Sequence, residues 1–285
     1  MIDVKEISRT TAQRMKQDLE KSYMEIIPFP GIENKLITLP KDIYVAITCS
    51  PTKGVDETLN LTEKVVGQGF KVVPHIASRC VSDEKHLELI IKKLDALGVD
   101  SIFVPGGDRP EPMGDFNSAL DLLRTLDKLG HGFSKIGIAA HPEGHPEIVD
   151  EVLMEALQEK KEIATFMVTQ MCFDASILKY WLLEIKKQGI DLPVWVGLPG
   201  VIDRGRLLKT SLRIGVGDSL RFLRKKSQVA TKLMKSSIYY PDDLFRNISE
   251  LDNESLTHFA GYHLFCFNQI ETTEKWRTDT ISSLS

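Results

Sequence analysis

Short hydrophobic runs recur along the chain, and the segments between them carry apolar residues at helical spacing. Most of the short runs lack strict alternation of polar and apolar residues, which is typical of strands covered on both faces of a parallel sheet. Eight runs have the length and composition of strands, and they span residues 23–28, 43–48, 71–76, 101–104, 135–140, 165–170, 193–198 and 262–267.

The clearest helical segment lies between the third and fourth of these runs. Ser82 precedes it as a candidate N-cap and acidic residues open it. Its one apolar face is formed by Leu87, Ile90, Ile91 and Leu94, and Gly98 ends it. Similar patterns predict helices at residues 9–21, 56–66, 115–129, 146–161, 176–187, 206–214, 217–234 and 241–259.

Eight strands that alternate with helices predict an α/β fold of the (β/α)8 TIM barrel type. We expect a single domain over residues 1–285, because no linker or low-complexity tract interrupts the pattern. The N-terminal helix is extra and could cap the bottom of the barrel, and the link 28–43 is too short for a full first crossover helix. An open doubly wound sheet is the alternative fold.

Composition and charge narrow the class of partner. The chain is 42% hydrophobic and 27% charged, and its 36 Lys and Arg against 40 Asp and Glu give a formal net charge of -4. This balance disfavours nucleic acid and anionic membranes as partners. The apolar stretches are far shorter than the roughly 20 residues that span a bilayer, and the charged N-terminal segment does not resemble a signal peptide, so we expect a cytoplasmic protein.

The four cysteines show no metal-binding spacing. Cys49, Cys80, Cys172 and Cys266 are widely separated and include no CxxC pair. Three of them lie in apolar runs, where a thiol usually acts as a small buried hydrophobe.

In a TIM barrel the active site lies at the C-terminal ends of the strands, so polar residues there are candidates for chemistry. Glu25 stands inside an otherwise apolar run, where a carboxyl group tends to hold its proton and suits a general acid. An exposed edge position or a Lys partner would explain it equally well. The other candidates are Thr48, His75, Gly106, Gly107, Asp108, His141, His145, Gln170 and Asn268.

Three groups of these candidates allow more than one interpretation. Gly106, Gly107 and Asp108 would let the backbone approach a ligand and place a carboxylate at the barrel mouth, or would form a tight turn. The amide of Gln170 suits the edge of a heteroaromatic ring, or it bonds to backbone. His75, His141 and His145 could converge on a metal as in barrel hydrolases, although no HxH or HExxH motif is present and we expect no metal.

Taken in order, these residues resemble methylenetetrahydrofolate reductase, a flavin-dependent (β/α)8 barrel family. The resemblance runs from the first strand to the last. It is carried by Glu25 and Pro28 in MEIIPF, Ile47-Thr48, Pro74-His75, Gly107-Asp108-Arg109-Pro110, the stretch 140–147, Thr169-Gln170, Phe173-Asp174 and the run 263–268.

The resemblance implies a role for each position. Glu25 would be the general acid that protonates a folate nitrogen and opens the imidazolidine ring, and Asp108 would bond the pterin and stabilise the cation. Gln170, Asn268 and Gln269 would contact substrate. The positions that would contact FAD are Thr48, His75, Gly107, Asp108, Ala140, His141, His145, Lys160 and Lys161.

The resemblance further implies an oxidoreductase of one-carbon metabolism that uses NADH or NADPH, acts on tetrahydrofolate derivatives and forms a homo-oligomer. Several positions depart from the family pattern. The family's Arg before Gly-Asp is Gly106, its Tyr before Pro-Glu is His141, and the Arg after the final Asn is Gln269. Because these departures fall on FAD and substrate contacts, a flavin-independent variant and a non-catalytic folate-binding homologue are both kept as alternatives.

Overall fold

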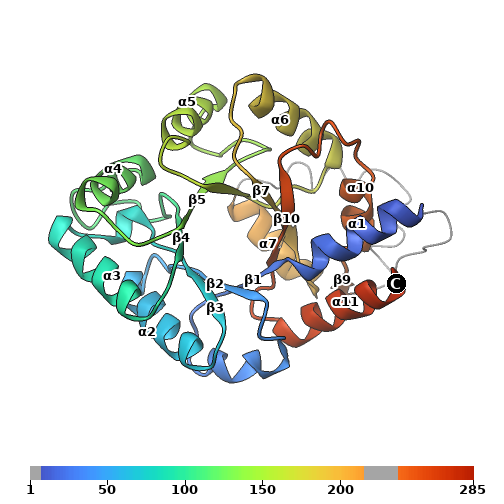
Figure 1. Ribbon diagram of the computed structural model, residues 1–285, viewed down its shortest axis with the longest axis horizontal. Helices are drawn as coiled ribbons and strands as arrows, with labels where there is room; N and C mark the ends of the chain where they lie inside the picture. The colour runs from blue at the N-terminus through green and yellow to red at the C-terminus, as the bar shows by residue number, and fades with distance from the viewer. Residues whose placement is uncertain (1–7, 215–236) are drawn as a thin grey trace.

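Eight parallel strands form a barrel in the computed structural model, which describes residues 8–214 and 237–285. The strands run in the order β3-β2-β1-β10-β7-β6-β5-β4, and Figure 1 shows the helices in a ring around them. All eight predicted strands are confirmed: β1 Tyr23–Ile26, β2 Tyr44–Ile47, β3 Lys71–Pro74, β4 Ser101–Val104, β5 Lys135–Ala140, β6 Phe166–Thr169, β7 Val194–Pro199 and β10 Phe259–Phe265.

The two edge strands of this order close the ring through the residue after β3. His75 forms a parallel bridge with Phe103, and the Ile76 amide donates to the Phe103 carbonyl at 2.8 Å. Closure leaves the barrel almost without free edges. It excludes the open-sheet alternative and places His75 at a junction that holds the fold together.

The described helices follow the predicted order with shifted ends. Five crossover helices agree with their predicted segments, whereas the helix predicted at 241–259 ends ten residues early, and the one predicted at 217–234 lies outside the described residues. The bounds are α1 Arg9–Glu20, α2 Gly54–Gly67, α3 Glu84–Ala96, α4 Ala119–Leu129, α5 Asp150–Lys160, α6 Ala175–Lys187, α7 Arg204–Arg213, α10 Asp242–Ser249 and α11 Ile270–Ser283.

The predicted cap of α3 is wrong by one residue. Asp83 is the N-cap, and its carboxylate accepts a hydrogen bond from the His86 amide at 2.8 Å. Ser82 instead lies with its amide and hydroxyl 3.2 Å from His86 Nδ1. Since Asp and Ser cap equally well, the pattern alone could not choose between neighbouring residues. Gly98 ends the helix region with a φ of 67°, as predicted.

The first crossover is short, as expected, and α1 occupies the helical layer. A 3-10 helix, η1 Ile32–Thr38, replaces a crossover α-helix. The buried residues of α1, Ala12, Met15 and Leu19, belong to the core between strands and helices and not to the cluster inside the barrel. Helix α1 packs against α11 and β10, so it does not fill the bottom of the barrel interior.

Large and small side chains alternate inside the barrel. The interior cluster consists of Tyr23, Ala46, Val73, Phe103, Phe166 and Val168. A Cβ on Gly137 would lie 2.3 Å from the Phe166 ring, and one on Gly197 would lie 2.4 Å from the Thr169 carbonyl oxygen. The interior is therefore a packed core, and chemistry is confined to its C-terminal end.

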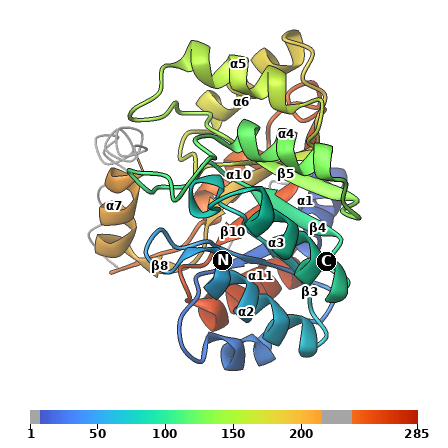
Figure 2. The ribbon, with the colours of Figure 1, turned by 90° about the vertical axis from the view of Figure 1, so that its left-hand side faces the viewer.

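A two-stranded antiparallel ribbon that the sequence pattern did not predict follows β7. It pairs β8 Ile202–Asp203 with β9 Ile238–Tyr239. In Figure 2, α7 and β8 lie at the end of the barrel opposite α1 and the C-terminus. Of the described helices, none has the length and apolar character to cross a membrane.

Candidate active site at the C-terminal end of the barrel

Glu25 projects from β1 and pairs with a histidine of the neighbouring strand β10. Its Oε2 lies 3.0 Å from Nε2 of His263. The side chains are 13% and 3% exposed, so Glu25 is the member of the pair that solvent reaches. The alternative explanations of Glu25, an exposed edge position or a Lys partner, are wrong, because its partner is a buried imidazole.

The segment after Glu25 is also held by residues at the end of β10. The Cys266 thiol donates to the Glu25 carbonyl at 2.7 Å. The Asn268 side chain accepts from the Ile27 amide at 2.8 Å and donates to the Ile27 carbonyl at 3.0 Å. Asn268 has a φ of 63°, which Asn tolerates better than most residues.

Asn268 and Gln269, the two predicted substrate residues at this end, differ in whether their side chains are already engaged. The side-chain amide of Asn268 is occupied by the backbone of Ile27, directly after β1, which indicates a structural role in placing Glu25. Gln269 is exposed at the start of α11, where its carbonyl accepts from Thr272 Oγ1 at 3.2 Å. Its contact with substrate stays a prediction.

His75 is buried beside the pair. Its ring centroid lies 6.2 Å from that of His263 and 4.6 Å from that of Phe103. Burial, with a smaller contribution from His263, lowers the pKa of His75 well below its usual value, so its ring is neutral. Its Nε2 has no hydrogen-bond partner. A residue this deep lies under the mouth of the barrel.

The histidine trio considered as a metal site does not assemble. Within the described residues, the set whose ligand atoms come within 4.8 Å of one another is Glu25, His75 and His263. His141 and His145 pair with each other instead, with ring centroids 5.3 Å apart. Two histidines and a glutamate can ligate zinc, but the Glu25–His263 hydrogen bond already engages two of the three groups.

The loop after β4 carries Asp108 and is fixed by one arginine. Arg79 donates from Nε to the Arg109 carbonyl at 2.7 Å, from Nη1 to the Asn117 carbonyl at 3.1 Å, and from Nη2 to the Pro110 carbonyl. Gly107 has a φ of 95°, and a Cβ there would lie 3.0 Å from Cβ of Ala77. Glycine is therefore required where this loop passes the end of β3. Asp108 itself is exposed.

Replacing Arg79 by Lys should loosen this loop. A lysine cannot reproduce the planar fork that reaches three carbonyls. Losing one to two net hydrogen bonds, at roughly 1 kcal/mol each, should speed amide hydrogen exchange of residues 106–117 by about tenfold. Mass spectrometry would follow the exchange, with Arg124→Lys, which alters an exposed ion pair with Glu159, as the control. Unchanged exchange in the loop would contradict the assigned role of Arg79.

The loop after β5 gathers some of the predicted cofactor residues and separates others. Burial lowers the pKa of His141 to about 4, with His145 and Lys160 contributing. Burial also lowers the pKa of Lys160 to about 8. Lys161, by contrast, donates to the Gly189 carbonyl at 2.9 Å and so faces the loop between α6 and β7.

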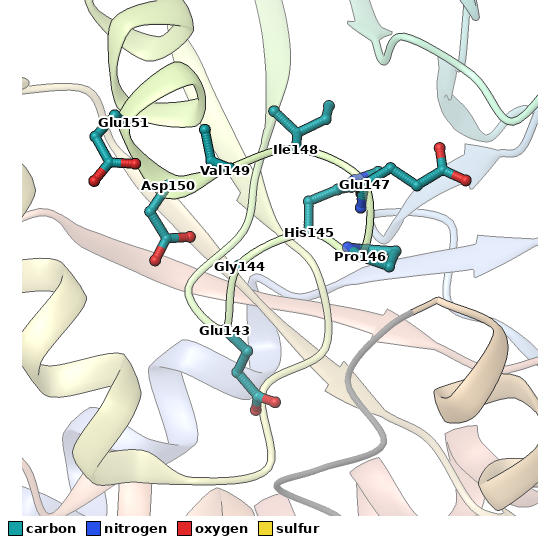
Figure 3. A pocket seen from close by; sticks show the side chains of 9 residues that line it. All are labelled: Glu143, Gly144, His145, Pro146, Glu147, Ile148, Val149, Asp150 and Glu151. Carbon is teal, nitrogen blue, oxygen red and sulfur yellow. Dashed lines mark hydrogen bonds between the residues drawn. The ribbon is translucent and has the colours of Figure 1, made fainter.

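The pocket formed by this loop is acidic. Figure 3 shows the residues that line it, 143–151, with the carboxylates of Glu143, Glu147, Asp150 and Glu151 spread around its rim. Glu143 points away from the others and accepts from the Phe173 amide at 2.8 Å, which ties the loop to the end of β6. Such a lining does not favour an anionic ligand.

Acid should destabilise the protein through the two neutral histidines. Above about pH 6.5 His75 and His141 are neutral in both the folded and the unfolded state, so they do not lower the free energy of unfolding. As the pH falls from there toward 4, the two histidines bind protons in the unfolded chain but stay neutral in the folded protein, because burial lowers their pKa values. The free energy of unfolding therefore falls. Urea titrations should show a shallower loss over this range in His141→Gln; an identical slope would argue against a buried neutral His141.

The remaining candidates lie at the ends of β2, β5 and β6. The Gln170 amide nitrogen of the backbone donates to the Ala140 carbonyl at 2.8 Å, and its side-chain oxygen accepts from the Met171 amide at 2.9 Å. The Thr48 carbonyl accepts from the Thr58 hydroxyl at 3.0 Å. Ala140 is buried, whereas Gln170 and Thr48 are half-buried. Their ligand contacts stay predictions.

His263 is the residue that the sequence pattern missed. The pattern puts it in the last strand and the resemblance includes it in the run 263–268, but neither gives it a role. Period-2 spacing would have put it on the same face of that strand as Gly261 and Phe265. Only the pairing of β1 with β10, which sets Tyr23 against His263, brings it to Glu25.

Comparison with known proteins identifies the family. The methylenetetrahydrofolate reductase family model matches residues 35–207, more than half of the chain. The chain belongs to the methylenetetrahydrofolate reductase family. Both the sequence resemblance and the TIM barrel agree with this membership.

The curated relatives are similar over part of their length. Methylenetetrahydrofolate reductase 2 of Saccharomyces cerevisiae is 30% identical over 117 residues, 37% of this chain and 19% of the relative. Methylenetetrahydrofolate reductase 1 of Schizosaccharomyces pombe is 26% identical over 184 residues, 59% of this chain and 30% of the relative. Methylenetetrahydrofolate reductase (NADH) 1 of Arabidopsis thaliana is 24% identical over 202 residues, 60% of this chain and 33% of the relative. The chain thus spans a third or less of each.

Proposed function

We propose that this chain reduces methylenetetrahydrofolate to methyltetrahydrofolate with a hydride from NADH or NADPH. The observation that carries the proposal is Glu25, a carboxyl group held at the C-terminal end of the barrel of a reductase-family member, with a buried imidazole 3.0 Å away. A fixed acid at this end is what opening a folate ring requires.

The proposed chemistry balances with one proton and one hydride. Glu25 donates its proton to the folate nitrogen of the one-carbon bridge, the bond from that nitrogen to the bridging carbon breaks, and an iminium cation remains. A hydride from the nicotinamide forms the new C–H bond and leaves a methyl group and oxidised nucleotide. Asp108, exposed at the mouth, would stabilise the cation by its negative charge, and solvent would return the proton to Glu25.

Among the described residues, those that the resemblance assigns to FAD do not form a site that fits its diphosphate. Lys161 bonds the Gly189 carbonyl, His75 is buried under the mouth, and carboxylates surround the pocket beside His145. Lys160 is left as the cation next to His141. We therefore derive no step through flavin, and we propose that the hydride passes directly from nicotinamide to folate.

Turnover without added flavin is the test. The purified chain is mixed with methylenetetrahydrofolate and either NADH or NADPH, with and without FAD, while nucleotide absorbance and methyltetrahydrofolate by mass spectrometry are followed. We expect methyltetrahydrofolate to form without FAD.

Three other results would overturn part or all of the proposal. Turnover that requires FAD would leave the reductase and remove direct transfer. Calorimetric binding of folate without turnover in either direction would identify a non-catalytic folate-binding homologue. No turnover and no folate binding would overturn the function altogether.

A further inference from the structure

His263 faces Glu25 across the junction of β1 and β10, and the pair is nearly closed off from solvent. Strand pairing sets Tyr23 against His263 and Glu25 against Phe265, so the side chains of Glu25 and His263 point into the barrel from adjacent strands. The Nε2 of His263 lies 3.0 Å from Oε2 of Glu25, within hydrogen-bond distance for a shared proton.

The surroundings of the pair are apolar or neutral. The Phe265 and Tyr23 rings lie with centroids 5.0 Å and 6.2 Å from that of His263. Three titratable groups that lie against the pair are neutral: His75 directly after β3, the Tyr23 phenol, and the Cys266 thiol, which bonds the Glu25 carbonyl. Burial raises the pKa of Tyr23 above its ordinary value, and burial raises that of Cys266 to about 12.

A buried pair in such surroundings is least costly when it carries no net charge. One proton shared between carboxyl and imidazole meets this condition, whether the proton sits on Oε2 or on Nε2. A lone carboxylate in the same place would hold a net negative charge without a compensating cation.

We propose that His263 is a positioning residue that aims Glu25 and holds a proton with it, so that the carboxyl group is ready to protonate folate. The inference rests on the proposed function, because Glu25 is the group that would touch substrate. His263 acts only through Glu25. When Glu25 transfers the shared proton to the folate nitrogen, a carboxylate beside an unprotonated Nε2 remains, and a proton from solvent restores the pair.

The variant His263→Gln separates holding a proton from donating a hydrogen bond. Glutamine can donate to Glu25 but cannot take up a proton. We expect kcat for folate reduction to fall by about tenfold or more, KM for folate to stay within about twofold, and turnover to be lost at a lower pH on the alkaline side.

The matched control is His258→Gln. His258 directly precedes β10, at the end of the strand away from the mouth, and its Nε2 lies 3.5 Å from Asp191 Oδ1. The variant therefore removes a similar histidine–carboxylate pair outside the mouth. A merely structural role for His263 would lower turnover evenly at every pH. An unshifted alkaline limb in His263→Gln, or an equal shift in His258→Gln, would overturn the proposal.

A second measurement does not depend on turnover. With 15N-labelled histidine, the Nε2 signal of His263 should move in Glu25→Gln and stay in place in Asp191→Asn. If the signal moves in Glu25→Gln but the unsubstituted chain does not turn over folate, the pair is real and the proposed function fails. If it does not move, the proposal for His263 fails whatever the activity.

Metal binding is the third test of the proposal for His263. Glu25, His75 and His263 are the described groups that could ligate one ion, and the probe is Zn²⁺ alone, titrated into the purified chain. We expect no stoichiometric binding. One Zn²⁺ per chain that is lost in both His75→Gln and His263→Gln would show that the three side chains are ligands, and it would overturn the shared proton.

Discussion

Replacing Glu25 by Gln is expected to lower kcat for folate reduction by roughly 10²- to 10⁴-fold, the range that a positioned general acid contributes. Glutamine keeps the size of the side chain and a hydrogen bond to His263, but it has no proton to give. Binding of the oxidised or reduced nucleotide should be unchanged, because the substitution leaves the rest of the mouth intact. Stopped-flow or steady-state assays of methyltetrahydrofolate formation would measure the loss.

Glu33→Gln is the control for this substitution. Glu33 pairs with Lys64 at 3.0 Å on η1, outside the mouth of the barrel, and its replacement should leave kcat within about twofold because it contacts no candidate site residue. Folate reduction retained in Glu25→Gln would remove Glu25 from the mechanism. Loss of circular dichroism together with activity would indicate instead that the carboxyl group supports the fold.

The sequence pattern predicts the barrel well because its signal is local. Each strand is a short apolar run, and burial on both faces makes such runs visible without alignment or coordinates. Residues whose role depends on neighbouring strands are not visible in this way. Glu25 stands out because a carboxyl group interrupts an apolar run, whereas His263 sits in a strand that tolerates it without any local anomaly.

The candidate site shows the same difference between local and long-range signals. The structure places the candidate residues at strand ends, as the pattern predicts, but several of the candidate side chains contact residues far away in sequence. Asn268 bonds the backbone of Ile27, 241 residues away in sequence, and Lys161 bonds the loop after α6. Neither partner can be predicted from sequence spacing. Asn268, a predicted substrate contact, holds the residue that follows β1, and Lys161, a predicted cofactor contact, points to the loop between α6 and β7.

Helix α11 escaped prediction because its buried face is polar. Of its buried residues Ile270 and Trp276 are apolar, while Thr273, Glu274, Arg277 and Thr280 carry polar groups. Hydrophobic periodicity, the main signal for helices, is therefore weak here. The buried polar groups are stabilised by pairing with each other. Arg277 donates to both carboxylate oxygens of Glu274, at 2.8 and 3.0 Å, and to the Leu19 carbonyl at 3.0 Å.

Replacing Arg277 by Met is expected to destabilise the protein by about 3–5 kcal/mol, because it leaves the Glu274 carboxylate buried without its partner and frees the Leu19 carbonyl. The side chains of Arg277 and Glu274 are only 6% and 7% exposed, so water cannot replace the lost bonds. The pair also joins α11 to the end of α1, which means that both helices should lose protection from hydrogen exchange. Urea unfolding monitored by tryptophan fluorescence would measure the change.

Arg124→Met tests whether burial causes that loss. Arg124 and Glu159 form an ion pair of 3.1 Å whose side chains are 61% and 53% exposed, and its removal should cost less than about 1 kcal/mol. Replacing Glu274 by Met in the Arg277→Met background should recover most of the stability, because no buried charge then remains unpaired. If Arg277→Met cost no more than Arg124→Met, the buried pair would not be what fastens α11 to α1.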